Sequence, residues 1–107
     1  MARALRRSRQ LAITMAIVHQ PKVQLRMHML LWHLADRFGR VRPGGAALEL
    51  PLTHAQLAEL IAARRPTVSA ALTALEREGV LGREGETWIL TGPPPGELLA
   101  MYPTGAS

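Results

Sequence analysis

A short run of polar and basic side chains stands at the start of a predicted helix in the middle of the chain. The run begins with Arg64 and Arg65, continues through Thr67 and Ser69, and ends at Thr73. Guanidinium and hydroxyl groups hydrogen-bond to the edges of nucleic-acid bases and to phosphate oxygens. The chemistry that this spacing suggests is therefore non-covalent recognition of a polyanion.

The other residue types that could carry chemistry do not form a recognised catalytic or metal-binding arrangement. The chain has no cysteine, and no two histidines have the spacing of four residues that places two ligands on one helix face. Ser69 lacks the Gly-x-Ser-x-Gly context of an activated serine. We therefore expect no catalytic residue, no metal site and no cofactor within this chain, and we interpret Trp32 and Trp88 as core residues.

The elements that position the polar run begin at Thr53. Its hydroxyl group can cap the first turn of a helix, and Gln56 follows at the spacing of a capping box. Leu57, Leu60 and Ile61 then fall on one face of that helix. The sequence therefore predicts a short amphipathic helix just before the polar run.

A second helix, predicted over residues 65–78, follows a turn at residues 62–64. Pro66 fits only in the first helical turn, where its missing N–H costs nothing, and Gly79 can close the helix in a left-handed conformation. The apolar stripe of this helix consists of Val68, Ala71, Leu72 and Leu75. Two short helices with a tight turn form a helix-turn-helix, whose second helix lies in the major groove of DNA. An ordinary helical hairpin with no DNA role is the alternative.

Five residues of the predicted recognition helix are candidates for contacts to DNA bases: Arg65, Thr67, Ser69, Ala70 and Thr73. Arg65 stands at the helix N-terminus, where a guanidinium can donate two hydrogen bonds to guanine O6 and N7. A phosphate contact is its alternative role. Thr67, Ser69 and Thr73 lie on the side away from the apolar stripe, and the methyl group of Ala70 can pack on a thymine methyl group.

Five further residues are candidates for contacts to the DNA backbone: Thr53, His54, Gln56, Arg64 and Arg83. The first three stand at the N-terminus of the first helix, where amides and side chains can bind phosphate. Arg64 lies in the turn. Arg83 lies in a polar, glycine-containing segment between two β-prone runs, which predicts a hairpin, or wing. A solvated surface charge is the alternative for Arg83.

An N-terminal helix is predicted over residues 3–19, and its second half, LAITMAIV, is apolar almost all round. A helix of this kind has to be buried on more than one side. Because a small domain covers only one side, we expect a second copy of the chain to cover the other, with Leu11, Met15 and Val18 in the dimer contact. A single helix packed in the groove of a monomer is the alternative.

The stretch between these two regions predicts a further helix and two short strands. After Pro21, a helical stripe is formed by Val23, Met27, Leu30, Leu31, Leu34 and Phe38. A Pro-Gly-Gly turn and the alternating residues 48–50 then indicate two short strands between residues 40 and 52.

The distribution of charge conflicts with DNA binding by the second half of the chain. The 107 residues, enough for one domain, have a formal net charge of +5, which suits a polyanionic partner. Residues 1–42 carry nine Arg and Lys against one acid, whereas residues 43–107 carry four Arg against seven Glu, a net charge of −3. We follow the helix-turn-helix pattern, because a few well-placed donors set specificity more than bulk charge does.

Several segments resemble the DNA-binding half of the cyclic-AMP receptor/FNR (Crp/Fnr) family of bacterial transcription regulators. They are LLWHLADRFGRV (Leu30 to Val41), the following Pro-Gly-Gly turn, LPLTHAQLAELIAARRPTVSAALTALEREGVL (Leu50 to Leu81) and WILTGPPP (Trp88 to Pro95). The resemblance implies a winged helix-turn-helix preceded by the end of a long dimerisation helix. The GntR type of winged helix shares the Thr-Val and Leu-Glu-x-Glu-Gly spacing, but the first segment and the Pro-Gly-Gly hairpin favour the receptor-protein type.

The chain also departs from this family. Its members carry an N-terminal β-barrel for a cyclic nucleotide or another effector, which this sequence cannot form. We therefore expect either a fragment or a stand-alone truncation, favour the fragment, and assign no effector site to this chain. Arg65 matches the first base-reading arginine of the best-known members, but Pro66 and Ala70 replace their glutamate and second arginine. Ala62 stands where the turn usually has glycine. The operator of those members therefore does not carry over.

These observations predict a mainly helical α+β fold with small hairpins. It comprises a dimerisation helix (residues 1–20), a winged helix-turn-helix domain (residues 21–95) and a tail (residues 96–107). The predicted function is binding of a homodimer to an inverted-repeat operator in double-stranded DNA, with RNA polymerase as a further candidate partner. The lack of cysteine and of a long apolar run predicts a cytoplasmic protein without membrane contact. The alternative is a protein-interaction or dimerisation module that no longer reads DNA.

Overall fold

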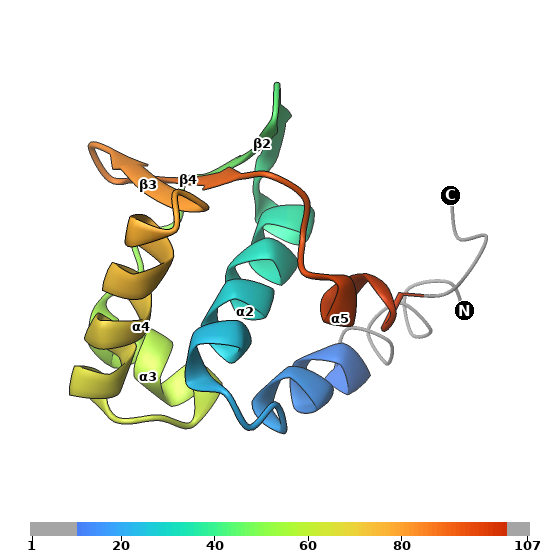
Figure 1. Cartoon of the computed structure of the whole chain (residues 1–107), viewed down its shortest axis with the longest axis vertical. Coiled ribbons are helices and arrows are strands. Elements are labelled where there is room, and N and C mark those ends of the chain that lie inside the picture. Colours follow the sequence, from blue (N-terminus) through green and yellow to red (C-terminus); the bar gives the residue numbers. More distant parts are fainter. Residues whose placement is uncertain (1–10, 103–107) are drawn as a thin grey trace.

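The computed structural model describes residues 11–102 of the chain. Its helices are α2 (Val23–Phe38), α3 (His54–Ile61), α4 (Arg65–Arg77) and α5 (Gly96–Leu99), and its strands are β1 (Arg40–Arg42), β2 (Gly45–Leu48), β3 (Leu81–Glu84) and β4 (Thr87–Thr91). Residues 11–18 are helical as well. Helix α2 runs through the middle of the molecule, with α4 on one side and α5 on the other (Figure 1). The predicted α+β fold is confirmed.

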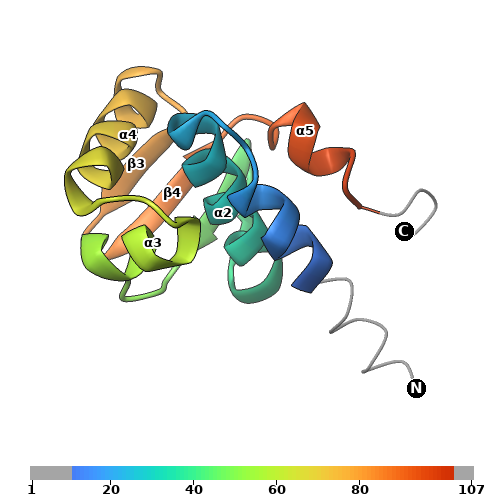
Figure 2. The same ribbon diagram turned by 90° about the horizontal axis from the view of Figure 1, so that it is seen from below.

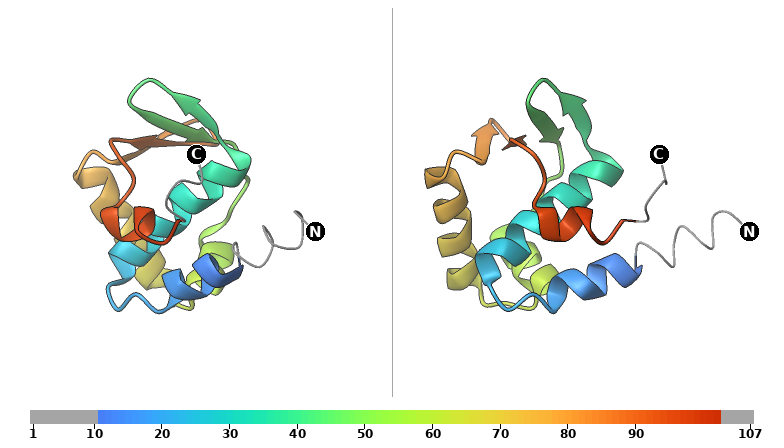
Figure 3. Two further views of the ribbon diagram at one scale, coloured as in Figure 1. Left: turned by 90° about the vertical axis from the view of Figure 1, so that its right-hand side faces the viewer. Right: turned by 45° about the vertical axis from the view of Figure 1, so that its right-hand side comes forward.

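The four strands form one antiparallel sheet in the order β1-β2-β4-β3. The two hairpins predicted from the sequence are therefore joined, because β2 pairs with β4 from Gly45 opposite Thr91 to Leu48 opposite Trp88. The predicted position of the second strand is wrong. The alternating residues 48–50 indicated a strand there, whereas β2 runs from Gly45 to Leu48. The sheet covers one end of α2, and residues 11–18 lie near the other end (Figure 3).

Gly45 explains how the two hairpins approach each other so closely. A Cβ atom at this position would lie 1.8 Å from the carbonyl oxygen of Leu90, so a larger residue would push β2 away from β4. The Pro-Gly-Gly turn therefore supplies more than a reversal of the chain. Its second glycine permits the strand pairing that fixes the wing hairpin β3–β4 to the body of the domain.

Helix α2 is the centre of the hydrophobic core. Met27, Leu30 and Leu31 of the predicted stripe are buried, but so are three residues outside it, Met29, His33 and Ala35. The reason is that α2 contacts α3, α4, β2 and α5, so it buries most of its circumference. The prediction for Phe38 is wrong: its side chain is 54% exposed at the last turn of the helix. Trp88 is buried as predicted, whereas Trp32 is only half-buried.

The two ends of the described chain lie beside α2. In the N-terminal helical segment, residues 11–18, Ile13 and Ile17 are buried, whereas Leu11 and Met15 are 61% and 63% exposed. Residues 3–10 of the predicted helix lie outside the described residues. At the other end, α5 contacts α2 and its Leu98 is fully buried, so part of the predicted tail belongs to the core. Within the described part of the chain, every helix is too short or too polar to cross a membrane.

Candidate nucleic-acid interface

Helix α3 begins with the capping box that its sequence predicts. The Thr53 hydroxyl oxygen accepts a hydrogen bond from the backbone N–H of Gln56 at 3.0 Å, and the Gln56 side-chain oxygen accepts one from the N–H of Thr53 at 2.8 Å. Both side chains are used to close the helix end. An anion at this end would therefore meet the positive end of the α3 dipole and its first backbone amides.

The turn between the helices has the predicted extent, from residue 62 to residue 64. Ala62 adopts the left-handed conformation, with φ of 55°. The Crp/Fnr family, which the sequence resembles, usually has glycine at this position. The neighbouring Ala63 donates its N–H to the carbonyl oxygen of Ala58 at 2.9 Å. Helix α4 follows at Arg65 with Pro66 in its first turn, as predicted. Figure 2 shows α3 and α4 side by side, on the side of the molecule away from α5.

Helix α4 separates an inner apolar face from an outer polar face. Val68, Ala71, Leu72 and Leu75 are all buried, as the stripe predicts. Four of the five base-contact candidates, Arg65, Thr67, Ala70 and Thr73, are exposed on the other side. Arg77 is exposed too and extends this face by one turn; its spacing of four from Thr73 was a signal that the sequence prediction missed.

Ser69 differs from the other outer residues, because it is half-buried and engaged within the protein. Its hydroxyl group lies 2.8 Å from Nδ1 of His54, which links the first residue of α3 to the second turn of α4. The hydroxyl group of Thr73 donates to the backbone carbonyl of Ser69 at 3.0 Å. The structure thus brings a backbone-contact candidate and a base-contact candidate into direct contact, which the sequence did not predict.

The wing is the hairpin β3–β4, at the position predicted from the sequence. The guanidinium carbon of Arg83 lies 3.9 Å from the centre of the Trp88 ring, a cation–π contact that orients the arginine on the sheet. Glu84, the next residue, is paired with Arg42 of β1 at 3.2 Å. The wing therefore carries one exposed arginine beside a glutamate whose charge is offset by the neighbouring hairpin.

Residues of the first half of the chain offset part of the negative charge of the second half. Arg42 pairs with Glu84, and Arg40 pairs with Glu49. Gln24 of α2 donates to the carboxylate of Glu78, just after α4, at 2.6 Å. Within the described residues, three of the seven glutamates in residues 43–107 thus have polar partners from residues 11–42, and two of these partners are arginines. The conflict between charge and helix pattern is therefore smaller in the folded chain than in the sequence.

Arg26 of helix α2 stabilises the turn between α3 and α4. This half-buried arginine donates to the backbone carbonyl oxygens of Gln20, Ile61 and Ala62, at 2.9, 2.6 and 3.4 Å. The sequence offered no signal for these contacts, since Arg26 lies 35 and 36 residues from its partners in the turn. A charged side chain bound to the last carbonyls of a helix also interacts favourably with the helix dipole.

The two histidines of α2, His28 and His33, have pKa values below the usual value for histidine. Burial lowers the pKa of His33; the negative charge of Asp36 opposes this shift, and the positive charge of Arg37 reinforces it. Burial also lowers the pKa of His28, against the opposing charge of Glu78. Tyr102 contacts Nδ1 of His33 through its hydroxyl group at 3.0 Å, and burial raises the pKa of this tyrosine to about 12. Within residues 11–102, no three His, Asp or Glu side chains gather as a metal site would require.

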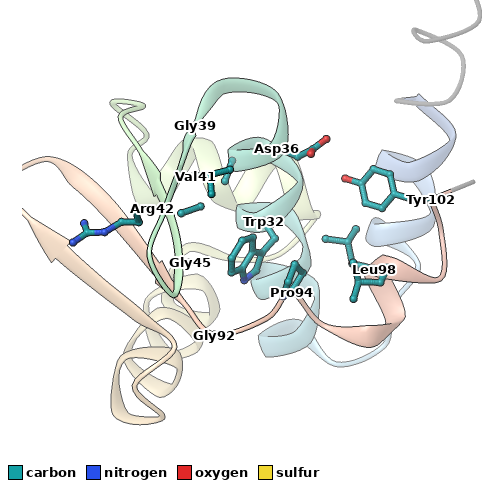
Figure 4. Close-up of a pocket in the computed structure, with 13 residues that line it drawn as sticks. Trp32, Asp36, Gly39, Val41, Arg42, Gly45, Gly92, Pro94, Leu98 and Tyr102 are labelled. Carbon is teal, nitrogen blue, oxygen red and sulfur yellow. The ribbon is translucent and has the colours of Figure 1, made fainter. Parts of the chain in front are cut away.

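A cavity of about 620 Å³ lies between α2, the β1–β2 hairpin and α5. Figure 4 shows Trp32, Leu98 and Tyr102 along one part of its wall, with Val41 of β1 and Asp36 of α2 at other parts. Because α2 separates α5 from α4 (Figure 1), this cavity is on the other side of the molecule from the outer face of α4. It therefore does not belong to the candidate nucleic-acid interface.

Comparison with known families identifies the helix-turn-helix. Residues 25–93 match the family model described as the Crp-like helix-turn-helix domain. The chain belongs to this family. Its members are DNA-binding transcription regulators, and the match spans α2 from Leu25 onward, the whole sheet and the helix-turn-helix. The resemblance found in the sequence is therefore confirmed at the level of the family.

Several solved structures of Crp-type regulators share this fold. TTHB099, a transcriptional regulator of the CRP family from Thermus thermophilus, is 25% identical, with a TM-score of 0.68 over 94% of this chain and 49% of its own. A CooA mutant from Carboxydothermus hydrogenoformans is 25% identical, with a TM-score of 0.63 over 85% of this chain and 40% of its own. Oxidised CprK, in complex with o-chlorophenolacetic acid, is 25% identical, with a TM-score of 0.59 over 72% and 31%. This chain thus spans less than half the length of each. No curated protein matches it.

Proposed function

We propose that this Crp-like domain binds an inverted-repeat operator in double-stranded DNA as a homodimer and thereby regulates transcription. The observation that carries the proposal is the outer face of α4. Its exposed residues begin with Arg65 and continue through Thr67, Ala70, Thr73 and Arg77, while the opposite face is buried in the core. A helix held in this way presents one polar face to the major groove.

Within the groove, we assign base recognition to Arg65, Thr67, Ser69, Ala70 and Thr73. Arg65 stands at the helix N-terminus and has the fork of donors that guanine O6 and N7 require. Ala70 leaves space for a thymine methyl group. The Ser69 hydroxyl group is hydrogen-bonded to His54. Ser69 therefore contacts a base only through the remaining hydrogen-bonding capacity of its hydroxyl group; its alternative role is to fix α4 on α3.

We assign backbone contacts to both sides of the groove. At the N-terminus of α3, the amides of His54 and Ala55 offer donors to one phosphate. The capping box already uses the amides and side chains of Thr53 and Gln56, which hold this helix end in place, and the His54 side chain binds Ser69 of α4. Arg64 is exposed just before α4, and Arg83 is exposed on the wing. These contacts would fix the register of the domain on DNA without reading its sequence.

The dimer part of the proposal rests on the N-terminal helical segment. Leu11 and Met15 present large apolar side chains to solvent on the side that Ile13 and Ile17 do not use, and Val18 is half-buried. A second copy covering Leu11 and Met15 would give a symmetric contact between identical surfaces. Two recognition helices related by such symmetry read half-sites about one helical turn of DNA apart.

A domain that contacts proteins and no longer reads DNA is the second candidate. It is favoured by Pro66 and Ala70, which stand where the best-known members of the resembling family carry base-reading side chains. Glu76, exposed near the end of α4, adds a negative charge close to the proposed groove contacts. This candidate predicts DNA binding that is weak, blind to sequence and strongly dependent on salt.

Selection from a random duplex library tests the proposal. The purified chain is incubated with the library at about physiological salt, where non-specific binding to phosphate is suppressed. We expect enrichment of an inverted repeat whose half-sites are about one helical turn apart. A single enriched half-site would contradict the dimer. Absence of enrichment, with binding that disappears as salt rises, would contradict sequence reading and favour the second candidate.

A further inference from the structure

Arg26 joins two parts of the chain that are distant in sequence and that both lie next to functional elements. Its Nε donates to the carbonyl oxygen of Gln20 at 2.9 Å. Its Nη1 donates to the carbonyl oxygens of Ile61 at 2.6 Å and Ala62 at 3.4 Å. One rigid guanidinium therefore holds Gln20, two residues after the N-terminal helical segment, and the end of α3 at a fixed separation.

The contact at Gln20 connects Arg26 to the N-terminal helical segment. The N–H of Gln20 donates to the carbonyl oxygen of Ile17 at 3.0 Å, and Ile17 is one of the buried residues that seat this segment on the core. Gln20 therefore links the segment at 11–18, through Ile17, to the guanidinium of Arg26. A change in the direction of this segment would move the carbonyl group that Arg26 binds.

The contacts at Ile61 and Ala62 connect Arg26 to the recognition helix. Ile61 is the last residue of α3, and Ala62 is the left-handed residue that redirects the chain. Helix α4 begins three residues after Ala62, at Arg65. Because a non-glycine residue in the left-handed region is strained, the conformation of this turn depends on the groups that hold it. Arg26 is such a group, and it binds both carbonyls with a charged donor.

We propose that Arg26 is a positioning residue that couples the direction of the N-terminal helical segment to the placement of α4. A shift of that segment at Gln20 competes with the hydrogen bonds to Ile61 and Ala62, and so alters the angle at which α4 leaves the turn. This inference rests on the proposed function and deepens it: the segment that would form the dimer and the helix that would read DNA are joined through a single side chain.

A lysine at this position separates coupling from charge. Arg26→Lys keeps one positive charge but has only one nitrogen, which cannot reach Gln20 and Ile61 with the same fork of donors. Arg37→Gln is the matched control, because Arg37 is an exposed arginine of the same helix whose guanidinium lies over the neighbouring Phe38 ring. Thermal unfolding of both variants first establishes that each is folded.

Amide hydrogen exchange in the free protein provides the first readout and needs no DNA. The reporter is the N–H of Ala63, which bonds to Ala58 behind the turn. Pro21→Gly loosens the junction next to Gln20, and Pro93→Gly is a control at another exposed proline. We expect Pro21→Gly to speed exchange at Ala63 by roughly threefold in the native background and to add nothing in Arg26→Lys. Additive effects, or no effect of Pro21→Gly at Ala63, would overturn the coupling.

DNA specificity provides the second readout. For the selected operator and a scrambled duplex of equal length at one salt concentration, we expect Arg26→Lys to lower the ratio of affinities by about fivefold. Arg37→Gln should leave this ratio unchanged. A lower Tm for Arg26→Lys with an unchanged ratio would show a merely structural role and would overturn the proposal. If the native protein itself shows no preference, the proposed function fails, while the exchange experiment still decides the coupling.

Discussion

At the scale of single residues, Arg64 and Arg65 are neighbours with different predicted tasks. Arg64 precedes α4 and lies outside the helix, whereas Arg65 is its first residue. Both are exposed. A guanidinium at the first helical position can enter the groove, while one in the turn is nearer to the DNA backbone. The two arginines therefore form a matched pair for separating base reading from phosphate binding.

We expect Arg65→Ala to lose about 1–3 kcal/mol of binding free energy on the selected operator and to relax the preference at one base position. Arg64→Ala should weaken binding to all sequences about equally and lower the slope of log K against log salt by about one. Titrations of both variants against the operator and its single-base variants, at several salt concentrations, measure these effects. An equal loss on every sequence for Arg65→Ala would reassign this residue to phosphate.

His33 gives the domain a predicted dependence on pH. Burial lowers its pKa in the folded chain, so between that lowered value and about 6.5 the unfolded chain binds more protons than the folded chain. The free energy of unfolding therefore falls as pH decreases through this window, and the stabilisation is fully present above it. We expect Tm to drop between about pH 7.5 and pH 5. His33→Asn should show a smaller drop, and the part that remains includes the contribution of His28, whose pKa burial also lowers.

Single-residue roles were only partly predictable from the sequence. The exposure of Arg65, Thr67 and Thr73 follows from helical periodicity, which the buried stripe of α4 obeys. The contact between His54 and Ser69 does not, because it depends on the angle at which α3 crosses α4. That angle is set by packing between helices, which no local pattern specifies.

At the scale of elements, the helix-turn-helix was predictable because its signals are local. The cap at Thr53, the proline of the first turn of α4 and the glycine after it act within a few residues of their positions. The joining of the two hairpins was not predictable in this way. It needs β2 to pair with β4, which lies far along the chain beyond the helix-turn-helix, and depends on the missing side chain of Gly45.

The backbone of Ala62, in the turn between α3 and α4, is strained. Its φ of 55° places an L-residue in the left-handed region, which costs about 1–2 kcal/mol. Ala62→Gly removes this cost but adds about 0.4–1 kcal/mol of chain entropy to the unfolded state, so we expect a net stabilisation of roughly 0.5–1 kcal/mol. Chemical unfolding measures it. Ala63→Gly, next to it but without positive φ, should destabilise the fold, and a lower stability of Ala62→Gly would show that the strain is absent.

At the scale of the whole molecule, the described structure separates the candidate DNA-binding face from the cavity. The outer face of α4 and the wing lie on one side of α2, whereas α5 and the cavity at Trp32 lie on the other (Figure 1). The N-terminal helical segment lies near the end of α2 remote from the sheet (Figure 3). A second copy bound to this segment would therefore leave the outer face of α4 open to DNA.

The dimer makes a prediction that separates assembly from DNA chemistry. Met15→Glu places a charge on the exposed apolar side of residues 11–18, which a partner copy would have to bury unpaired. We expect the native chain to sediment as a dimer at micromolar concentration and Met15→Glu as a monomer. On the full inverted repeat the variant should bind at least about tenfold more weakly, because two half-sites no longer act together.

Binding to a single half-site is the measurement that distinguishes lost assembly from a damaged DNA surface. On this duplex the affinity of Met15→Glu should equal that of the native chain, since Met15 lies on the N-terminal helical segment and not on the outer face of α4. Val41→Glu, at a residue that is 94% exposed on β1, is the control for added charge. A native chain that is monomeric at micromolar concentration, or a variant that loses half-site binding as well, would contradict a dimer built on these residues.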